Sequence, residues 1–355
     1  MNFERYSRQI QLKEFGLASQ KKLSTSKVLV VGAGGLGIPA LTYLNAMGVG
    51  TLGIIDNDVV GVSNLHRQVS YTENDIGKSK ITVLAEKLKA QNSDTKLIMY
   101  DAFLVKQNAL EILSSYDLII DASDNFPTRY LVNDACVILD KPFIYGALHS
   151  FEGQVSVFNY KNGPTYRCLF PTMPKANEVP NCNENGVLGV IPGIIGNLQA
   201  LEAVKVITEI GEVLSGKLLL FDGLNQNFQK INFKKVAKNG EIKMLNESYE
   251  FECDVNLSIT SLEFQNLLKI KKIQLLDVRT KQEFDSFHLK DGIHIPISEI
   301  IERQSELDFT KTIYVICQSG QRSQKAINLL VQQQPKATFI NVSGGINQMD
   351  IYALK

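Results

Sequence analysis

The sequence predicts an α/β protein in which a mostly parallel, helix-covered sheet is followed by a smaller α/β unit. Between residues 28 and 146, short β-rich runs alternate with helical patterns. This alternation is typical of parallel strands joined by right-handed crossovers, with helices on both faces of the sheet. A glycine-rich turn follows the first strand, and an apolar helical pattern follows the turn. The length of 355 residues allows two domains, or one large domain with an appendage.

The composition excludes several functional classes. Lys plus Arg and Asp plus Glu number 37 each, so no overall charge favours nucleic acid or an acidic membrane surface as a partner. No apolar run reaches the roughly 18 residues that span a bilayer, and the start MNFERYSRQI has no signal-peptide core. Five scattered cysteines argue against a disulfide framework. We therefore expect a cytoplasmic protein.

The elements of the first unit follow a polar, helix-prone lead-in over residues 1–26, which by itself is typical of a solvated helix. The expected strands are Val28–Val31, Leu52–Ile55, Leu97–Tyr100, Leu118–Asp121 and Phe143–Tyr145, and the expected helices are Ile38–Met47, Lys80–Gln91, Gln107–Ser114 and Thr128–Leu139. Ligands of such sheets bind beyond the carboxyl ends of the strands. We expect Asp56, Asp58 and Asp124 at that edge.

The pattern changes after Gly153. Added strands, expected to be antiparallel, are Gln154–Phe158, Lys217–Asp222 and Phe228–Lys234, and an apolar helix is expected over Ile194–Ile210. The Pro-studded run from Pro171 to Gly186 has no pattern of its own, and a loop of this length is usually functional or mobile. Because the sequence after residue 235 turns polar, we expect a first domain over 1–235, a linker over 236–257 and a second domain over 258–355.

The glycine-rich turn lies in the run VLVVGAGGLG. Gly32, Gly34 and Gly37 match G-x-G-x-x-G, with Gly35 between them. Glycines at these positions allow a tight turn and bring backbone N–H groups close to phosphate, as in Rossmann-like folds. Asp56 ends the next strand, where it can bind a ribose hydroxyl. The motif alone indicates a nucleotide or dinucleotide and does not say which chemistry follows.

Basic residues beyond Asp56 distinguish these possibilities. Arg67 lies in the run NLHRQ, and Lys80 ends the run GKSK. A nicotinamide dehydrogenase does not need these cations near its phosphates. A nucleotidyl transferase does, because charge develops on its pyrophosphate oxygens. Asp124, in the run DASDN, can hold Mg²⁺ on those phosphates. Taken singly, the cations could be surface charges and Asp124 a helix N-cap.

Six motifs in order extend this interpretation to a family. The motifs are RYSRQI, GAGGLG, DND, NLHRQ, GKSK and DASDN. They resemble the ubiquitin-activating-enzyme-like adenylyltransferases over roughly residues 1–235. Within that family they most resemble the enzymes that activate the small sulfur carriers of molybdopterin and thiamine synthesis. The resemblance implies that ATP and the C-terminal glycine carboxylate of a carrier form an acyl-adenylate with release of pyrophosphate.

The resemblance also assigns roles by position. It implies that Asp56 binds ribose and that Arg67 and Lys80 bind phosphates, and it makes Asp124 the residue that holds Mg²⁺ and supports adenylylation. Asp58 and Asn64 lie in the matching motifs and join the expected nucleotide site. Arg8 resembles an arginine that the partner subunit supplies in this family. The resemblance therefore implies a homodimer with composite active sites.

The cysteines of the first unit are interpreted through the same resemblance. Cys182, in the run NCNENG, occupies the place of a loop cysteine that some members use for a thioester, acyl disulfide or persulfide, although a silent exposed thiol is the alternative. Members often hold a structural zinc with two C-x-x-C pairs. Here the run TYRC, which ends at Cys168, replaces the first pair, and a lone Cys253 remains of the second. Four ligands are needed, so we expect no zinc and two ordinary thiols. Cys136 is expected in the core.

The second unit carries the run CQSGQRS from Cys317 to Ser323. A strand is expected over Ile313–Ile316 and a helix over Ser323–Gln332, so Cys317 opens a loop at a helix N-terminus. Loop N–H groups, the helix dipole and Arg322 would stabilise a thiolate or a persulfide.

Further motifs of the second unit complete a family resemblance. Together with LDVR, EF, HL and GIHIP, the run CQSGQRS resembles the rhodanese sulfurtransferases. Related phosphatase loops have five residues between Cys and Arg. The four residues found here favour a sulfur atom over a phosphate.

The two units together predict one reaction sequence. A carrier protein ending in Gly-Gly is adenylylated, and a Cys317 persulfide, loaded by an upstream donor such as a cysteine desulfurase, attacks the adenylate and releases AMP. The carrier could serve molybdopterin, thiamine or tRNA thiolation. A nicotinamide oxidoreductase and a non-catalytic nucleotide-binding scaffold remain as alternatives from other classes.

Overall fold

The computed structural model describes residues 3–174, 186–249, 257–334 and 336–349. These residues form two compact units, which divide between the described residues Tyr249 and Leu257. Cys182 and Cys253 lie outside the described residues.

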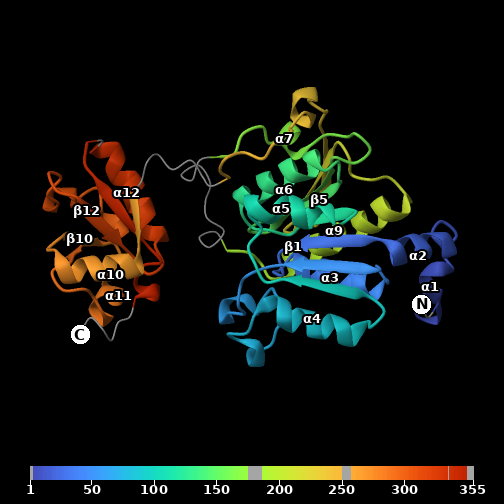
Figure 1. Cartoon of the computed structure of the whole chain (residues 1–355), viewed down its shortest axis with the longest axis horizontal. Coiled ribbons are helices and arrows are strands. Elements are labelled where there is room, and N and C mark those ends of the chain that lie inside the picture. The colour runs from blue at the N-terminus through green and yellow to red at the C-terminus, as the bar shows by residue number, and fades with distance from the viewer. Residues whose placement is uncertain (1–2, 175–185, 250–256, 335, 350–355) are drawn as a thin grey trace. The chain divides into compact units, whose positions relative to one another are not determined.

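The first unit is built on an eight-stranded sheet in the order β3-β2-β1-β4-β5-β6-β7-β8 (Figure 1). Its strands are β1 Lys27–Val31, β2 Thr51–Ile55, β3 Lys96–Tyr100, β4 Leu118–Asp121, β5 Phe143–His149, β6 Glu152–Phe158, β7 Lys217–Asp222 and β8 Asn227–Asn232. The strands from β3 to β5 are parallel, whereas β6, β7 and β8 add on in antiparallel order. This confirms the predicted mostly parallel sheet with antiparallel additions.

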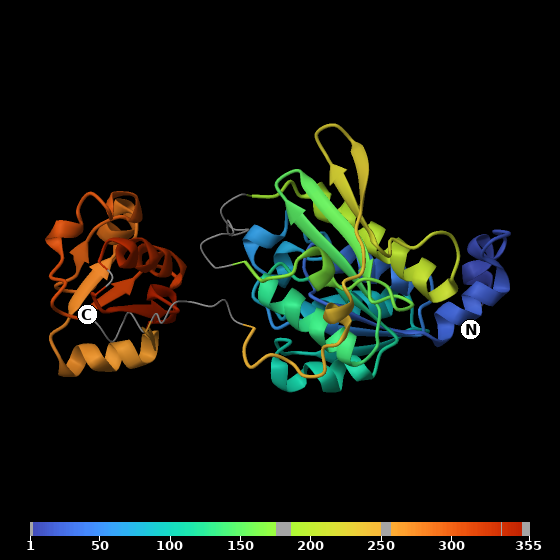
Figure 2. The same cartoon turned by 90° about the horizontal axis from the view of Figure 1, so that it is seen from above.

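Both faces of the parallel part are buried, which explains its continuous apolar strands. Along β1, Val28 and Val30 pack into one apolar cluster, while Leu29 and Val31 pack into another on the opposite face. The first cluster receives the helices α2 Gly16–Thr25, α3 Gly37–Ala46, α4 Lys80–Gln91 and α9 Val190–Thr208, and the second receives α5 Lys106–Ser114, α6 Phe126–Ile138 and the short α7 Tyr166–Leu169 (Figures 1 and 2). The lead-in is indeed helical, comprising η1 Phe3–Tyr6, α1 Ser7–Ile10 and α2.

Helix α9 is long and apolar enough to meet the length and composition criteria for a membrane span. It begins four residues before the predicted start. Half of its most apolar window is buried, and α9 packs against α3, β5 and β6. Its apolar character therefore follows from its place in the core of the first unit.

The second unit has a five-stranded parallel sheet in the order β11-β10-β12-β13-β9. Its strands are β9 Leu257–Thr260, β10 Gln274–Asp277, β11 Ile293–His294, β12 Ile313–Ile316 and β13 Phe339–Ser343, and its helices are α10 Ser261–Ile270, α11 Lys281–Ser286 and α12 Gln321–Gln333. Apolar residues of α12 and α10 enter two separate clusters. Strand β12 has the predicted bounds, and α12 begins two residues earlier than predicted.

The segment from Val236 to Tyr249 differs from the expected linker, because it is held against the first unit. The backbone N–H of Val236 donates to Cys168 Sγ at 3.2 Å, and Asn239 Nδ2 donates to the carbonyl of Arg167 at 2.9 Å. Tyr249 is 7% exposed. A polar composition alone therefore does not show that a segment is an unattached linker. Here, contacts with α7 and burial of Tyr249 attach the segment to the first unit.

A glycine of the turn tests how tightly the first unit is packed. A Cβ on Gly37 would lie 1.9 Å from the carbonyl oxygen of Gly32, whereas a Cβ on Gly193 in α9 would meet nothing within 4 Å. We expect Gly37→Ala to lower the free energy of unfolding by about 1–3 kcal/mol through overpacking. Gly193→Ala should raise it by about 0.5–1 kcal/mol, because glycine weakens a helix. Urea midpoints of the first unit measure both, and an unchanged midpoint in Gly37→Ala would contradict this packing.

Candidate functional site

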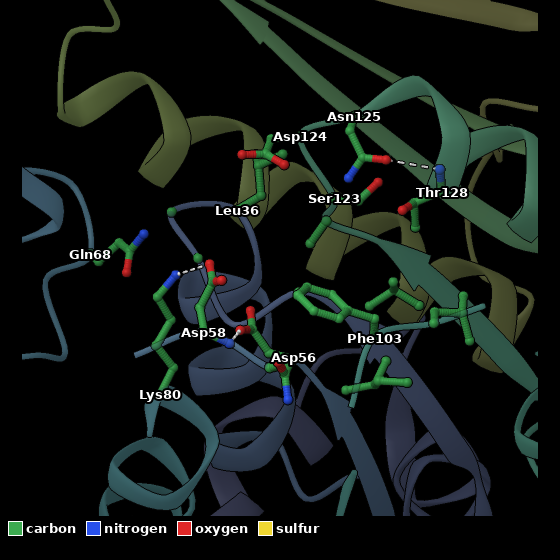
Figure 3. A pocket seen from close by; sticks show the side chains of 18 of the residues that line it. Leu36, Asp56, Asp58, Gln68, Lys80, Phe103, Ser123, Asp124, Asn125 and Thr128 are labelled. Carbon is green, nitrogen blue, oxygen red and sulfur yellow. Dashed lines mark hydrogen bonds and ion pairs between the residues drawn. The ribbon is translucent and has the colours of Figure 1, made fainter. Parts of the chain in front are cut away.

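A pocket opens at the carboxyl edge of the parallel strands, where nucleotide-type ligands bind in such sheets (Figure 3). Segments that follow β1, β2, β3 and β4 supply most of its lining. The lining includes Gly32, Gly34, Gly35, Leu36, Asp56, Asp58, Arg67, Gln68, Lys80, Phe103, Leu104, Ser123, Asp124, Asn125, Thr128, Leu148 and Pro192. The structure therefore brings together most residues of the predicted nucleotide site.

The glycines of the turn have different surroundings. Gly32 has φ +107°, and a Cβ there would lie 2.8 Å from the carbonyl oxygen of Ala122. Gly34 and Gly35 line the pocket. Gly37 is not among the lining residues, because it packs against the Gly32 carbonyl as α3 begins. Its requirement for glycine is one of close packing rather than ligand contact.

Asp56 ties the glycine turn to the chain that follows β2. One carboxylate oxygen accepts the backbone N–H of Ala33 at 2.7 Å, and the other accepts that of Asp58 at 2.8 Å. Hydrogen bonds to a charged acceptor are stronger than neutral ones. Asp56 therefore lines the pocket and also holds together the two segments on either side of it, the glycine turn and the chain after β2.

Lys80 is the first residue of α4 and is 4% exposed. Its ammonium donates to Asp58 Oδ2 at 2.7 Å (Figure 3). The hydroxyl of Tyr71 donates to the carbonyl of Ala33 at 2.8 Å and lies 3.3 Å from that of Lys80, so it connects the turn to α4. The lysine thus lies in the pocket with an acidic partner, a pairing that the sequence did not indicate.

Arg67 and Gln68 come from the segment between β2 and α4. Arg67 Nη1 donates to the carbonyl of Ser63 at 2.8 Å, so its guanidinium is held at the pocket. Gln68 is 4% exposed, and its Oε1 has no hydrogen-bond partner among the described residues. An unpaired buried oxygen in a pocket wall is suited to a ligand donor. Gln68 belongs to the NLHRQ motif but was not predicted as a site residue.

Asp124 and Asn125 follow β4. The sequence left open whether Asp124 is the N-cap of the next helix or a Mg²⁺ ligand. Asn125 is the N-cap of α6, and its Oδ1 accepts the backbone N–H of Thr128 at 2.9 Å (Figure 3). The cap is therefore Asn125 and not Asp124, and the Asp124 side chain lies exposed at the pocket. A carboxylate beside a phosphate site is the protein ligand that Mg²⁺ usually takes.

Besides Gly37, two predicted residues lie away from the pocket lining. Asn64 accepts the backbone N–H of Gly61 at 3.1 Å and closes a local turn. Arg8 lies exposed on α1 and is not among the lining residues. Phe103 was missed, although the carboxyl end of β3 had to reach the same edge. It lies on the pocket wall with Leu104 (Figure 3).

In the second unit, Cys317 directly follows β12 and is fully buried. Its sulfur accepts the backbone N–H of Gly320 at 3.1 Å and the hydroxyl of Ser323 at 3.4 Å. Gly320 has φ +91° and immediately precedes α12. The loop therefore directs a backbone N–H group and the N-terminus of α12 at the sulfur.

Arg322 forms an ion pair with Glu283. Its two terminal nitrogens donate to the two carboxylate oxygens at 2.7 and 2.6 Å. Arg322 and the N–H and hydroxyl of Thr280 hold the pKa of Glu283 near 2, although burial opposes this shift. Glu283 also caps α11 through Thr280. The arginine is thus fixed at the loop by α11.

The described cysteines of the first unit differ from each other. Cys136 is fully buried, and burial raises the pKa of its thiol, in keeping with a core residue. Burial also acts to raise the pKa of Cys168. Hydrogen bonds from Thr165, Val236 and Asn239 outweigh burial and lower that pKa. Among the described residues, no three His, Cys, Asp or Glu side chains form a metal-binding group.

Comparison with protein families identifies both units. The model of the ThiF family matches residues 6–242. The chain belongs to the ThiF family. A rhodanese-like domain model matches residues 260–350. The ThiF-family chain therefore carries a rhodanese-like region, as both motif sets predicted.

Relatives of similar length give the activities of this ThiF-family chain. "Adenylyltransferase and sulfurtransferase MOCS3" of Caenorhabditis briggsae is 40% identical over 381 residues, which cover 99% of this chain and 94% of that protein. The protein of the same name from Arabidopsis thaliana is 40% identical, with 92% and 79% covered. The ThiF-family chain is thus an enzyme, an ATP-using adenylyltransferase with a sulfurtransferase domain.

Solved structures agree on the fold. The crystal structure of Escherichia coli MccB with ATP matches with a TM-score of 0.59 and 23% identity, covering 66% of this chain and 73% of that one. Another MccB crystal structure matches with a TM-score of 0.60 and 21% identity, with 69% and 73% covered. At this identity the likeness shows the fold alone.

The ion pair of Glu283 predicts a pH dependence for the second unit. The pKa of Glu283 is near 2 in the folded chain and ordinarily 4.5. Its stabilising effect is therefore complete above about pH 5 and is lost as the pH falls toward 2. We expect Glu283→Gln to lose less stability than the wild type between pH 5 and pH 3. Urea midpoints of the second unit measure this, with Glu302→Gln, an exposed glutamate, as the control. Parallel pH curves for wild type and Glu283→Gln would contradict it.

Proposed function

We propose that this enzyme adenylylates the C-terminal glycine of a small ubiquitin-like sulfur carrier and then converts it to a thiocarboxylate with sulfur from Cys317. One observation carries the proposal. A single chain contains both a glycine-turn pocket with buried Lys80 and a loop whose Gly320 N–H donates to the sulfur of Cys317. The first can activate a carboxylate, and the second can supply the atom that replaces its oxygen. We also infer that the enzyme acts in the cytoplasm.

In this proposal, different pocket residues bind different parts of the nucleotide. The backbone N–H groups around Gly34 and Gly35 bind phosphate, and Asp56 accepts hydroxyls of the ribose. Arg67 and Lys80 lie where they can neutralise phosphate oxygens, and Asp124 would hold Mg²⁺ against them. When bound, Mg²⁺ offsets charge on the phosphates.

Adenylylation is a displacement at phosphorus. A carboxylate oxygen of the carrier's terminal glycine attacks the α-phosphorus, and the bond to the bridging oxygen of pyrophosphate breaks. Negative charge builds up on that bridging oxygen in the transition state. Lys80 and Arg67 stabilise it, because cations that are already held in place act on developing charge without having to reorganise.

Sulfur transfer then uses the adenylate as the leaving group. The terminal sulfur of a Cys317 persulfide, loaded by an upstream donor such as a cysteine desulfurase, attacks the acyl carbon and AMP departs. The product is an acyl disulfide on Cys317. A second thiolate, from Cys182 or an external thiol, attacks the Cys317 sulfur and releases the thiocarboxylate. An external dithiol then reduces the disulfide left on Cys317 by thiol–disulfide exchange and leaves as its own disulfide.

Arg8 extends the proposal to the assembly. It lies on α1 and outside the pocket lining of its own chain. We infer that it completes the phosphate site of a second copy, so that the active enzyme is a homodimer with two shared sites. Shared sites require the same two surfaces on both subunits, as in a twofold dimer.

The two half-reactions can be separated by substitution. Cys317→Ser should retain carrier-dependent exchange of pyrophosphate into ATP and form no thiocarboxylate. Asp124→Ala should lose both, with exchange falling roughly 100-fold or more because charge stabilisation is lost. Isotope exchange and the mass of the carrier measure these outcomes, with a carrier lacking its two terminal glycines as control. Normal sulfur transfer by Cys317→Ser would exclude the persulfide role.

The shared site predicts complementation between inactive variants. Arg8→Ala and Asp124→Ala should each be inactive alone. Mixed and allowed to exchange subunits, they form heterodimers in which one site has both residues, so about a quarter of wild-type exchange activity should return. Without subunit exchange no activity should return. Full activity of Arg8→Ala alone would show that Arg8 has no part in catalysis.

A further inference from the structure

The loop between β4 and α6, residues 122–125, carries Asp124 to the pocket. Its first residue, Ala122, donates its backbone N–H to the carbonyl of Val31 in β1 at 2.9 Å. Its last residue, Asn125, accepts the backbone N–H of Thr128 at 2.9 Å where α6 begins (Figure 3). Both ends of the loop are therefore fixed, and Ser123 connects the first end to Asp124.

Asp121, the last residue of β4, binds the backbone N–H and the hydroxyl of Ser123. Its Oδ1 accepts the N–H at 3.0 Å and the hydroxyl at 2.6 Å. Asp121 is itself fully buried, and Gln199 Nε2 of α9 donates to its carbonyl oxygen at 2.7 Å. Asp121 is not among the residues that line the pocket, whereas Ser123 is. Its link to the pocket is therefore indirect, through Ser123.

Arg129 of α6 binds the carbonyl of the same serine. Its Nη2 donates to the Ser123 carbonyl oxygen at 3.2 Å, and the arginine is buried. The guanidinium lies over the rings of Phe126 and Tyr145, at 5.3 and 5.4 Å from their centroids. Because aromatic faces attract a guanidinium, these contacts restrict its orientation. Arg129, like Asp121, is not among the residues that line the pocket.

The carboxyl of Asp121 and the guanidinium of Arg129 also interact electrostatically. Burial raises the pKa of Asp121, whereas the positive charge of Arg129 and the two hydrogen bonds from Ser123 oppose that rise. Polar groups are buried at low cost only where such partners satisfy them. Asp121, Ser123 and Arg129 therefore form one buried network beside the pocket, which we call the Ser123 network.

The Ser123 network determines where the backbone of Asp124 lies. A peptide group is planar, so the Ser123 carbonyl shares a plane with the backbone N and Cα of Asp124. Arg129 holds this plane on one side of Asp124, and the N-cap of α6 holds Asn125 on the other. The Asp124 side chain thus reaches the pocket from a backbone that is fixed on both sides. This matters for catalysis, because a displacement of about 1 Å can lower a rate roughly 100-fold.

We propose that Asp121 and Arg129 are positioning residues for adenylylation, because through Ser123 they fix the Asp124 carboxylate where it meets the phosphates and their Mg²⁺. This inference rests on the proposed function, in which Asp124 holds Mg²⁺ against the phosphates of ATP. Asp121 and Arg129 themselves touch neither ATP nor the carrier nor the metal. Their loss should weaken the metal-dependent part of ATP binding and leave the metal-independent part intact.

Calorimetric titration of the full-length enzyme with ATP tests the proposal without turnover. In EDTA, Asp121→Ala should bind ATP as the wild type does, because Asp121 is outside the pocket lining. With Mg²⁺ present, it should bind ATP roughly 10-fold more weakly than the wild type, because groups that orient a metal ligand typically contribute roughly 10–100-fold to metal affinity. Asp121→Asn keeps an oxygen acceptor for both groups of Ser123 and should bind ATP as the wild type does under both conditions. If Asp121→Asn is as weak as Asp121→Ala, or if Asp121→Ala already binds more weakly in EDTA, the positioning role is wrong.

Carrier-dependent exchange of pyrophosphate into ATP gives a second measurement. Arg129→Met keeps a long side chain but lacks the donor, and should lower kcat roughly 10–100-fold while the KM for the carrier is unchanged. It should also need more Mg²⁺ for half-maximal exchange, and excess Mg²⁺ should restore part of the rate. Excess Mg²⁺ should not restore Asp124→Ala, which lacks the carboxylate itself. Arg303→Met, the same change at an ion-paired arginine of the second unit, is the control and should exchange as the wild type does.

Failure of this inference and failure of the proposed function give different results. A lower kcat of Arg129→Met with an unchanged Mg²⁺ requirement would overturn the positioning role, although adenylylation itself would stand. A wild type that shows no exchange with any carrier would overturn the proposed function. The calorimetric comparison of Asp121→Ala with Asp121→Asn would then still decide whether the Ser123 network supports metal binding at Asp124.

Discussion

The carboxylate of Asp56 is the interaction on which the nucleotide pocket depends. It joins the turn after β1 to the chain after β2 by accepting the N–H groups of Ala33 and Asp58. The same Asp58 accepts the ammonium of Lys80 at the start of α4. Three segments that are distant in sequence are therefore joined through two neighbouring carboxylates. Burying the ammonium of Lys80 is favourable only when the charge is paired, and Asp58, whose own side chain is 61% exposed, supplies that partner.

Paired buried charges recur where the other segments meet. Asp134 and Arg167 join α6 to α7 and receive Tyr249. In the second unit, Arg279 is 2% exposed and pairs with Asp277 at the end of β10. Removing one member of such a pair leaves an unpaired buried charge, which costs more than the pair contributes. The Asp134–Arg167 pair holds two helices together, whereas Asp277 and Arg279 lie at the carboxyl end of β10, next to β12, which Cys317 follows.

Sequence patterns correctly predicted the strands and helices that depend on local periodicity. β1 and β4 are apolar runs buried on both faces, and α4 has the predicted bounds. The position of Asp56 followed from the glycine motif and the next strand. The partners of charged residues could not be predicted, since Glu283 meets Arg322 across 39 positions. Segment 236–249 was predicted to be a linker because its polar residues carry no periodic signal. Leu245 and Tyr249 nevertheless pack against the first unit, and hydrogen bonds from Val236 and Asn239 hold the other end of the segment.

The two N–H groups on Asp56 also limit which sugars the pocket can accept. A carboxylate offers about four acceptor sites, and two of these are already taken. In the ribose site proposed above, the remaining two match the pair of hydroxyls on an unmodified ribose. A phosphate ester on either hydroxyl would bring a second anion against the Asp56 carboxylate, so we expect nucleotides of the NADP type to be repelled. Adenine and guanine nucleotides carry the same sugar, so we expect Asp56 to select the sugar and not the base.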